Sequence, residues 1–349
     1  MENHELYDVT IIGSGPAGLY SAFYSGLRSM KTKIIEFQPK LGGKIHVYPQ
    51  KMIWDIGGLT PVTGQQLIDQ LTTQGLTFDP TVVLNEKVVK IEQNQDKTFV
   101  LHGESGQKHY SKTVVVAIGA GILKPQKLKL EGAERYEASN LQYIVKSLHQ
   151  YKDKTVIISG GGNSAIDWAV ELLPFAKQVY LTYRKDGLKG HEAQVELLHK
   201  SSAKCFYNTS ITKLNAHDNQ ASIESVELTN DQTGEIINLP IDDVIINHGY
   251  ERDAELFNNC SLDIKRVNDY NIACTSKGQS SVEGLFAAGD ILTYDGKVGL
   301  IAGAFQDAIN AVNSAKQFVQ PDAGEYAMVS SHNELFKEKN KELVKQLEN

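Results

Sequence analysis

The chain has 349 residues but only three cysteines, Cys205, Cys260 and Cys274, and no two of them lie within four positions of each other. This spacing excludes a CxxC redox pair and a metal site made from neighbouring cysteines, and the length excludes a small domain that depends on disulfides. Few cysteines and no export signal are typical of a reducing compartment, so we expect a cytoplasmic protein.

Long apolar runs and an excess of positive charge are also missing. No apolar stretch reaches the roughly 18 residues that a transmembrane helix requires, and residues 1–5 are acidic and polar, unlike a signal peptide. The net charge is −7, from 35 Lys and Arg against 42 Asp and Glu. Nonspecific binding of nucleic acid depends on concentrated positive charge. We therefore expect neither a membrane nor a nucleic-acid partner.

One pattern occurs twice in the chain. An apolar strand at 7–12 runs into a glycine-rich turn at 13–18, and a second strand at 154–159 runs into another such turn at 160–165. A helical stretch and a further apolar strand follow each turn, at 19–27 and 33–35, and at 166–173 and 178–181. Two βαβ units of this kind predict the α/β class, with two Rossmann-like dinucleotide-binding domains of the three-layer ββα type.

The first turn has the GxGxxG pattern of a dinucleotide site. Glycine lets the backbone turn tightly and approach the pyrophosphate, and the following helix points its free N–H groups at the phosphates. Glu36 ends the next strand, where a carboxylate accepts hydrogen bonds from both ribose hydroxyls of an adenosine. The turn residues expected to contact this cofactor are Gly13, Ser14, Gly15, Pro16, Ala17 and Gly18.

The second turn leads to a strand with a different ending. Gly162, Asn163 and Ser164 form the expected phosphate contact, and the next strand ends in Arg184 and Lys185 instead of an acid. A carboxylate would repel a ribose 2′-phosphate, whereas a guanidinium binds it in a fork. Two such contacts, reduced by solvent, predict a preference of about 100-fold for NADPH over NADH.

A third motif points to a flavin. Ala-Ala-Gly followed by Asp290 is typical of flavoproteins, in which this Asp reaches the ribityl chain. The helix expected at 299–318 would then direct its positive end at the pyrimidine edge of the flavin, which favours the reduced state.

The remaining elements predict that one domain is inserted into the other. We place the NADPH-binding domain at 118–247 and the FAD-binding domain at 1–117 and 248–349, with a C-terminal extension at 321–349. Further strands are expected at 82–91, 98–101 and 113–118, and a small antiparallel set at 223–228, 236–239 and 243–246.

The order of these parts resembles the ferredoxin/flavodoxin–NADP+ reductases of the thioredoxin-reductase-like flavoprotein type. The resemblance covers nearly the whole chain, and the stretch 138–143, where a thioredoxin reductase needs its CxxC, has no sulfur. It rests on the two turns and on Leu41-Gly42-Gly43, Tyr48-Pro49, Lys124-Pro125, His191-Glu192, Phe286 to Asp290, and Tyr294 with Gly296, Lys297 and Val298.

The resemblance implies roles for further residues. Tyr48 would stack on the isoalloxazine, Val88 would offer its backbone to the adenine, and Asp290 would hold the ribityl chain. Gly43 and Lys44 belong to the same FAD site, although Lys44 replaces a Gln, and Leu123 replaces a Phe. In the NADPH site the implied residues are Gly162, Asn163, Ser164, Arg184, Lys185, Lys189, which replaces a third Arg, and His191.

Relatives cover the second flavin face with a ring from the C-terminal tail, usually the tail of the partner subunit. In this chain a gapless match places Val329 there, with Ser331 near the flavin. A match on ring chemistry would select His332 instead. Both registers stay open, and we favour Val329.

The resemblance implies a homodimeric FAD enzyme that takes a hydride from NADPH and passes single electrons to ferredoxin or flavodoxin. The flavin carries the chemistry, so we expect no catalytic side chain and no metal. Docking of an acidic carrier needs a basic patch, for which Lys124, Lys127 and Lys129 are candidates. Two alternatives remain: a flavin reductase of a low-molecular-weight disulfide or a quinone, and an NADPH-sensing flavoprotein with little turnover.

Overall fold

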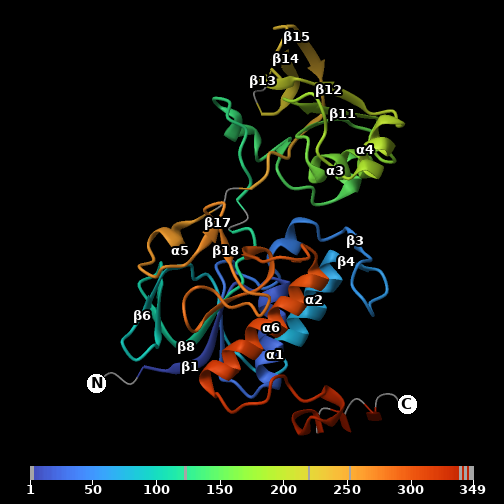
Figure 1. Ribbon diagram of the computed structural model, residues 1–349. Helices are drawn as coiled ribbons and strands as arrows, with labels where there is room; N and C mark the ends of the chain where they lie inside the picture. The colour runs from blue at the N-terminus through green and yellow to red at the C-terminus, as the bar shows by residue number, and fades with distance from the viewer. Residues whose placement is uncertain are drawn as a thin grey trace. The chain divides into compact units, whose positions relative to one another are not determined.

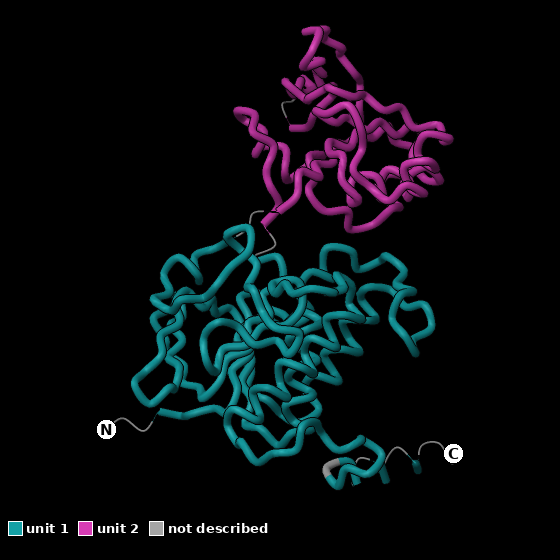
Figure 2. The backbone as a smooth tube through the Cα atoms, viewed as in Figure 1, with its two compact units in different colours: residues 1–122, 252–349 teal, residues 123–251 magenta. Residues whose placement is uncertain are grey.

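A computed structural model describes the chain except residues 1–3, 122–123, 219–220, 251–252, 338–339, 342–343 and 346–349. The chain divides into two compact units, one formed by residues 1–122 and 252–349 and the other by residues 123–251 (Figure 2). The sequence places these divisions at 117 and 247. Among the described residues, no helix is both long and apolar enough to cross a membrane.

The first unit is built on a largely parallel sheet. Its strand order is β5-β2-β1-β8-β7-β6, with β19 also paired to β8. The pairs among β5, β2, β1, β8 and β19 are parallel, whereas β6, β7 and β8 form an antiparallel meander. The strands are β1 (Leu6–Ile12), β2 (Thr32–Ile35), β5 (Thr81–Val83), β6 (Val88–Gln93), β7 (Phe99–Gly103), β8 (Lys108–Val116) and β19 (Leu285–Ala287).

Three helices lie side by side in the first unit: α1 (Pro16–Leu27), α2 (Gly64–Gly75) and α6 (Ile301–Val319) (Figure 1). Helix α1 packs between the other two, and four alanines of α6 are buried in the same core as the central strands: Ala304, Ala308, Ala311 and Ala315. Smaller elements complete the unit: β3 (Met52–Ile53), β4 (Val62–Thr63), α5 (Glu255–Asn258), β17 (Arg266–Val267), β18 (Asn271–Ala273) and β20 (Leu292–Thr293).

The second unit has a five-stranded parallel sheet of order β12-β11-β10-β16-β9 and a separate antiparallel sheet of order β13-β14-β15. Helices α3 (Asn163–Leu172) and α4 (Glu192–His199) belong to the same unit. The strands are β9 (Leu141–Gln142), β10 (Thr155–Ser159), β11 (Gln178–Tyr183), β12 (Lys204–Tyr207), β13 (Thr209–Ala216), β14 (Ile223–Asn230), β15 (Ile236–Pro240) and β16 (Asp243–Ile246).

Two expectations about strands are wrong. The single strand at 82–91 is interrupted, because Asn85 adopts a left-handed conformation with φ +55° and separates β5 from β6. Residues 243–246 do not join the antiparallel set. They form β16, which lies between β10 and β9 in the parallel sheet, and β13 takes the third antiparallel place. All four residues of β16 are buried, as is typical of a strand covered on both faces.

Candidate functional site

The turn after β1 is packed more tightly than any side chain would allow. A Cβ on Gly18 would lie 1.9 Å from the carbonyl oxygen of Gly13, and a Cβ on Gly43 would lie 2.6 Å from the Cα of Gly15. Gly13 itself has φ +98°. Helix α1 begins directly after Gly15, with Pro16 in its first turn and no side-chain cap. The first amides of α1 therefore remain open to a pyrophosphate.

Glu36 is held beside this turn. It is 7% exposed, and its Oε2 accepts hydrogen bonds from the backbone N of Ser14 at 2.7 Å and from the Ser14 hydroxyl at 2.6 Å. Its Oε1 accepts the backbone N–H of Gln38 at 2.9 Å. A carboxylate has about four acceptor positions, so these bonds orient Glu36 and leave capacity for a ribose hydroxyl. The donor set of the turn therefore fits an adenosine dinucleotide.

The charge of Asp290 acts on Tyr48 although 242 positions separate the two residues. Tyr48 follows a 3-10 turn at Gly43–Val47, and Asp290 follows β19 in another 3-10 turn, Gly289–Ile291. Burial raises the pKa of Tyr48 to about 12, and the charges of Asp290 and Asp55 act in the same direction. Sequence reasoning missed Asp55, because it lies in no motif.

Three further residues, Val88, Lys44 and Leu123, are expected at the FAD site. Val88 is buried at the start of β6, where it pairs with Gly103, and the backbone N–H of nearby Glu86 donates to the carbonyl of Glu36 at 3.0 Å. Lys44 is exposed in the turn at Gly43–Val47. Leu123 lies outside the described residues.

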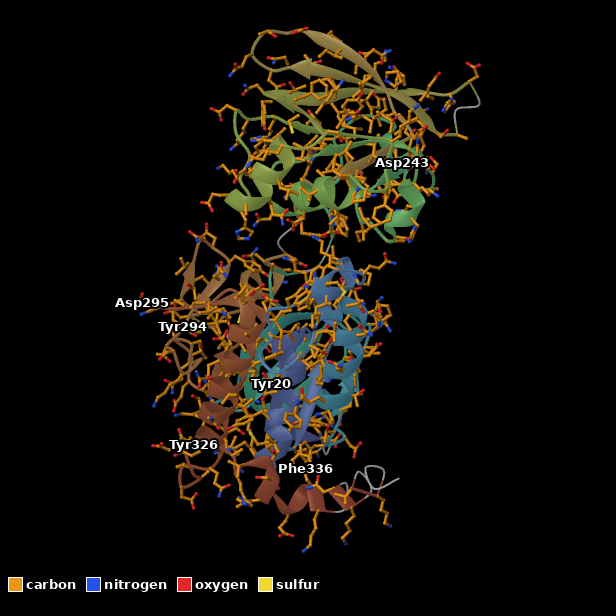
Figure 3. All side chains as sticks on the ribbon, turned by 90° about the vertical axis from the view of Figure 1, so that its right-hand side faces the viewer. Tyr20, Asp243, Tyr294, Asp295, Tyr326 and Phe336 are labelled. Atoms are coloured by element: carbon orange, nitrogen blue, oxygen red, sulfur yellow. The ribbon has the colours of Figure 1, made fainter. Side chains whose placement is uncertain are left out.

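The C-terminal tail packs at the far end of α1. The backbone N–H of Ala327 donates to the Tyr24 hydroxyl at 3.1 Å, and Arg28 donates to the carbonyl of Gly324 at 2.6 Å. Tyr24 is nine residues beyond Gly15, about 13 Å along the helix axis. Figure 3 shows Tyr326 and Phe336 at this end of the unit, away from Tyr294. The tail segment thus lies away from the phosphate turn of its own chain. Its residues Val329, Ser331 and His332 are all exposed.

The second phosphate turn is close-packed at its first glycine and open at its third. Gly160 has φ +154°, and a Cβ there would lie 2.5 Å from the carbonyl oxygen of Asn247. Gly162 precedes α3 without a side-chain cap, and a Cβ on it would meet nothing within 4 Å. This glycine therefore leaves open space above the start of the helix, which fits the approach of a phosphate.

The structure brings several expected NADPH contacts to this turn. The backbone N–H of Lys189 donates to the carbonyl of Gly161 at 2.7 Å, and the backbone N–H of His191 donates to Oδ1 of Asn163 at 3.0 Å. Ser164 is exposed in the first turn of α3. Arg184 and Lys185 are exposed at the carboxyl end of β11, which leaves both cations accessible to a 2′-phosphate.

Sequence reasoning missed His248. It follows β16 at the carboxyl edge of the sheet, where its Nε2 is 2.8 Å from the Ser159 hydroxyl at the end of β10. Burial lowers the pKa of His248, and the Arg184 charge lowers it further. The β10–β16 pair is where the strand order changes direction, the usual place for a ligand in such sheets. Correct placement of β16 in the parallel sheet would have identified His248.

The cysteines have no redox partner. All three are free, and burial raises the pKa of each thiol, to about 12 for Cys274. Cys205 belongs to one unit, and Cys260 and Cys274 belong to the other. Among the described residues, no group of His, Cys, Asp and Glu side chains could hold a metal ion.

Replacing all three cysteines by Ser should therefore leave the reduction of bound flavin by NADPH within about twofold of the wild-type rate, because protonated thiols are poor nucleophiles. Stopped-flow absorbance of the flavin band measures this rate. Loss of flavin reduction in a variant that unfolds at the wild-type temperature would show that a cysteine takes part.

Two phosphate turns, one beside a fixed carboxylate and the other beside exposed cations, define a class of oxidoreductase that binds two dinucleotides. The family model described as pyridine nucleotide-disulphide oxidoreductase matches residues 7–315. Ferredoxin–NADP reductase 1 of Bacillus mycoides is 70% identical over 347 residues and covers 99% of both chains, and ferredoxin–NADP reductase 2 of Exiguobacterium sibiricum is 64% identical over the whole chain and 99% of its own length. The chain belongs to the ferredoxin–NADP reductases of this family.

Solved structures support the fold. Thioredoxin reductase of Lactococcus lactis is 26% identical, with a TM-score of 0.76, and covers 90% of this chain and 99% of its own. The thioredoxin reductase of T. acidophilum has a TM-score of 0.75 at 22% identity and shows the fold alone. The α/β class with two Rossmann-like units is confirmed, and so is the expected use of FAD and NADPH.

Proposed function

We propose that this protein is an FAD-dependent oxidoreductase that transfers electrons from NADPH to ferredoxin. The observation that carries this proposal is the presence of both complete phosphate turns in one chain that is 70% identical to a ferredoxin–NADP reductase. When bound, FAD supplies the chemistry, since it takes up a hydride from a nicotinamide and releases single electrons.

The first unit holds FAD in this proposal. The open amides of α1 bind the pyrophosphate, and Glu36, oriented by Ser14, binds the adenosine ribose. Tyr48 covers one face of the isoalloxazine, and Asp290 binds the ribityl chain. The electrostatic interaction of Asp290 with Tyr48 supports this pairing, because both must reach the same end of one ligand.

The second unit holds NADPH. The start of α3 and the open space at Gly162 receive its pyrophosphate, and Arg184 and Lys185 bind the 2′-phosphate. Lys189 and His191, which lie against the turn, extend this site. No side chain of the protein needs to act as acid, base or nucleophile, because hydride transfer is chemistry that the two cofactors would supply.

Ferredoxin is the carrier that the names of the relatives support, and flavodoxin is the second candidate. At a net charge of −7, docking an acidic carrier requires a local basic patch. Lys124, Lys127 and Lys129 are all exposed, and Lys127 forms an ion pair with Glu137 at 2.7 Å. The patch is therefore weaker than the sequence suggests. We place the reaction in the cytoplasm.

The protein acts as a homodimer in this proposal, because the tail reaches a flavin only across a subunit boundary. Val329 is 62% exposed on a tail that is tied to the far end of its own α1. A neighbouring subunit could receive that tail over its own flavin.

Val329→His should perturb the flavin absorbance spectrum and the rate of hydride transfer, because an imidazole offers the flat face that valine lacks. Stacking contributes roughly 0.5–1.5 kcal/mol beyond area burial, so FAD affinity should change less than about tenfold. His332→Ala should change neither property. A larger effect from His332→Ala would assign the stacking position to His332.

Anaerobic mixing with NADPH tests the proposal and separates its alternatives. We expect flavin bleaching at a rate at least equal to steady-state turnover, followed by re-oxidation when ferredoxin is added. Flavin bleaching at a rate far below that of cellular redox turnover would favour the NADPH-sensing flavoprotein with little turnover. Re-oxidation by a low-molecular-weight disulfide or a quinone, but not by ferredoxin, would favour the other reductase.

A further inference from the structure

Asp307 is a buried carboxylate that none of the sequence motifs includes. It lies in the second turn of α6, and its side chain is 1% exposed. Its Oδ2 accepts hydrogen bonds from Nζ of Lys297 at 2.7 Å and from the backbone N–H of Gly289 at 3.3 Å. Its Oδ1 accepts the Tyr294 hydroxyl at 2.9 Å. Three donors from one nearby stretch of chain therefore converge on a single carboxylate.

These donors come from the segments that surround the expected flavin contacts. Gly289 directly precedes Asp290, and Tyr294 and Lys297 lie in the loop between β20 and α6 (Tyr294 is labelled in Figure 3). Gly289 has φ +80°, and a Cβ on it would lie 2.9 Å from the Cβ of Ala17 in the first turn of α1. The turn that Asp307 holds thus touches the helix that binds the pyrophosphate.

Stability alone does not account for this cluster. The side chain of Lys297 is 12% exposed, so the ion pair of Lys297 and Asp307 is largely removed from water. Its desolvation costs more free energy than that of a surface pair such as Lys97 and Glu283, whose side chains are both more than half exposed. Apolar residues of similar volume often stabilise a fold as well as a buried ion pair does. Burial and the Asp307 carboxylate together raise the pKa of Tyr294 to about 12.

We propose that Asp307 is a positioning residue for FAD, which fixes Asp290 and the start of α6 relative to the phosphate turn through Gly289, Tyr294 and Lys297. Helix α6 begins without a side-chain cap, so its first amides stay available to the flavin. With the loop tied to Asp307, these amides and Asp290 keep a fixed spacing. This inference rests on the proposed placement of FAD in the first unit.

Three double variants test the role, because all of them remove the buried charges and only one keeps an acceptor. Asp307→Asn with Lys297→Gln still accepts the Gly289 amide, whereas Asp307→Leu with Lys297→Met cannot. We expect the first to bind FAD within about threefold of wild type and the second to bind about tenfold more weakly or worse, from the loss of hydrogen bonds to a buried acceptor. Asp307→Ala with Lys297→Met, a smaller acceptor-free variant, should also bind weakly.

The measurements are FAD titration of the apo-protein, thermal unfolding of the apo-protein, and the midpoint potential of bound flavin. The acceptor-free variants should unfold near the wild-type temperature and give a more negative potential. Lys97→Gln with Glu283→Gln is the matched surface control and should change none of the three.

Wild-type FAD affinity in either acceptor-free variant would overturn the inference. The inference would also be overturned if FAD binding weakened equally in the variants with and without an acceptor and the apo-protein of each unfolded at a lower temperature. The role of Asp307 would then be purely structural. Wild-type apo-protein that binds no FAD would overturn the proposed function itself.

Discussion

Replacing Arg184 and Lys185 together by Gln should raise the KM for NADPH about 100-fold and leave the KM for NADH within about threefold, because only NADPH carries the 2′-phosphate. Both side chains are exposed at the end of β11, so their removal leaves no buried partner unsatisfied. The measurement is steady-state reduction of a neutral dye with each nucleotide.

A matched control separates the 2′-phosphate contact from the general loss of positive charge. Lys200 and Lys213 lie in the same unit, and each forms a surface ion pair, with Glu196 and Glu227 respectively. Changing both to Gln removes the same charge and should leave both KM values within about twofold, since exposed charges at a distance are screened. A parallel rise of the NADPH and NADH values in the Arg184/Lys185 variant would contradict the assignment.

Gly43→Ala should yield protein that is purified with little FAD and that binds added FAD about 10–100-fold more weakly. The new Cβ would lie 2.6 Å from the Cα of Gly15, so the backbone of the phosphate turn must move away from the ligand. Absorbance at the flavin band and titration of the apo-protein measure the effect.

Gly106→Ala is the control for backbone strain. Gly106 also has positive φ, +89°, but a Cβ on it would meet nothing within 4 Å, and it lies in the turn between β7 and β8. Both substitutions force alanine into a left-handed conformation, at roughly 1–2 kcal/mol. We expect Gly106→Ala to lower stability and keep a full FAD content. Equal flavin loss in both variants would mean that strain, and not the close approach, explains the result.

Local pattern was enough for the parts of the fold that neighbouring residues determine. The helices after the two glycine turns begin directly at those turns, and Glu36 at the end of β2 meets Ser14 only 22 positions away. Each combines an apolar strand with a turn that only glycine can form, so the sequence shows them directly.

The pairing of distant segments could not be predicted in the same way. The short run at 243–246 looks like an antiparallel strand, and only its pairing with β9 and β10 and its burial on both faces by the surrounding core show that it is β16. This misplacement concealed His248. Asp55 and Asp307 were missed for a related reason, since their importance depends on Tyr48, Gly289 and Lys297 being brought beside them in space.

The most direct test of the account is the rate at which the FAD-loaded protein reduces purified ferredoxin with NADPH, followed through cytochrome c as terminal acceptor. We predict a rate that saturates with ferredoxin, falls with added salt, and drops at low NADPH concentration in the Arg184/Lys185 variant. A rate no higher than the ferredoxin-free background, from protein whose flavin NADPH still bleaches, would contradict the assignment of ferredoxin as the electron acceptor.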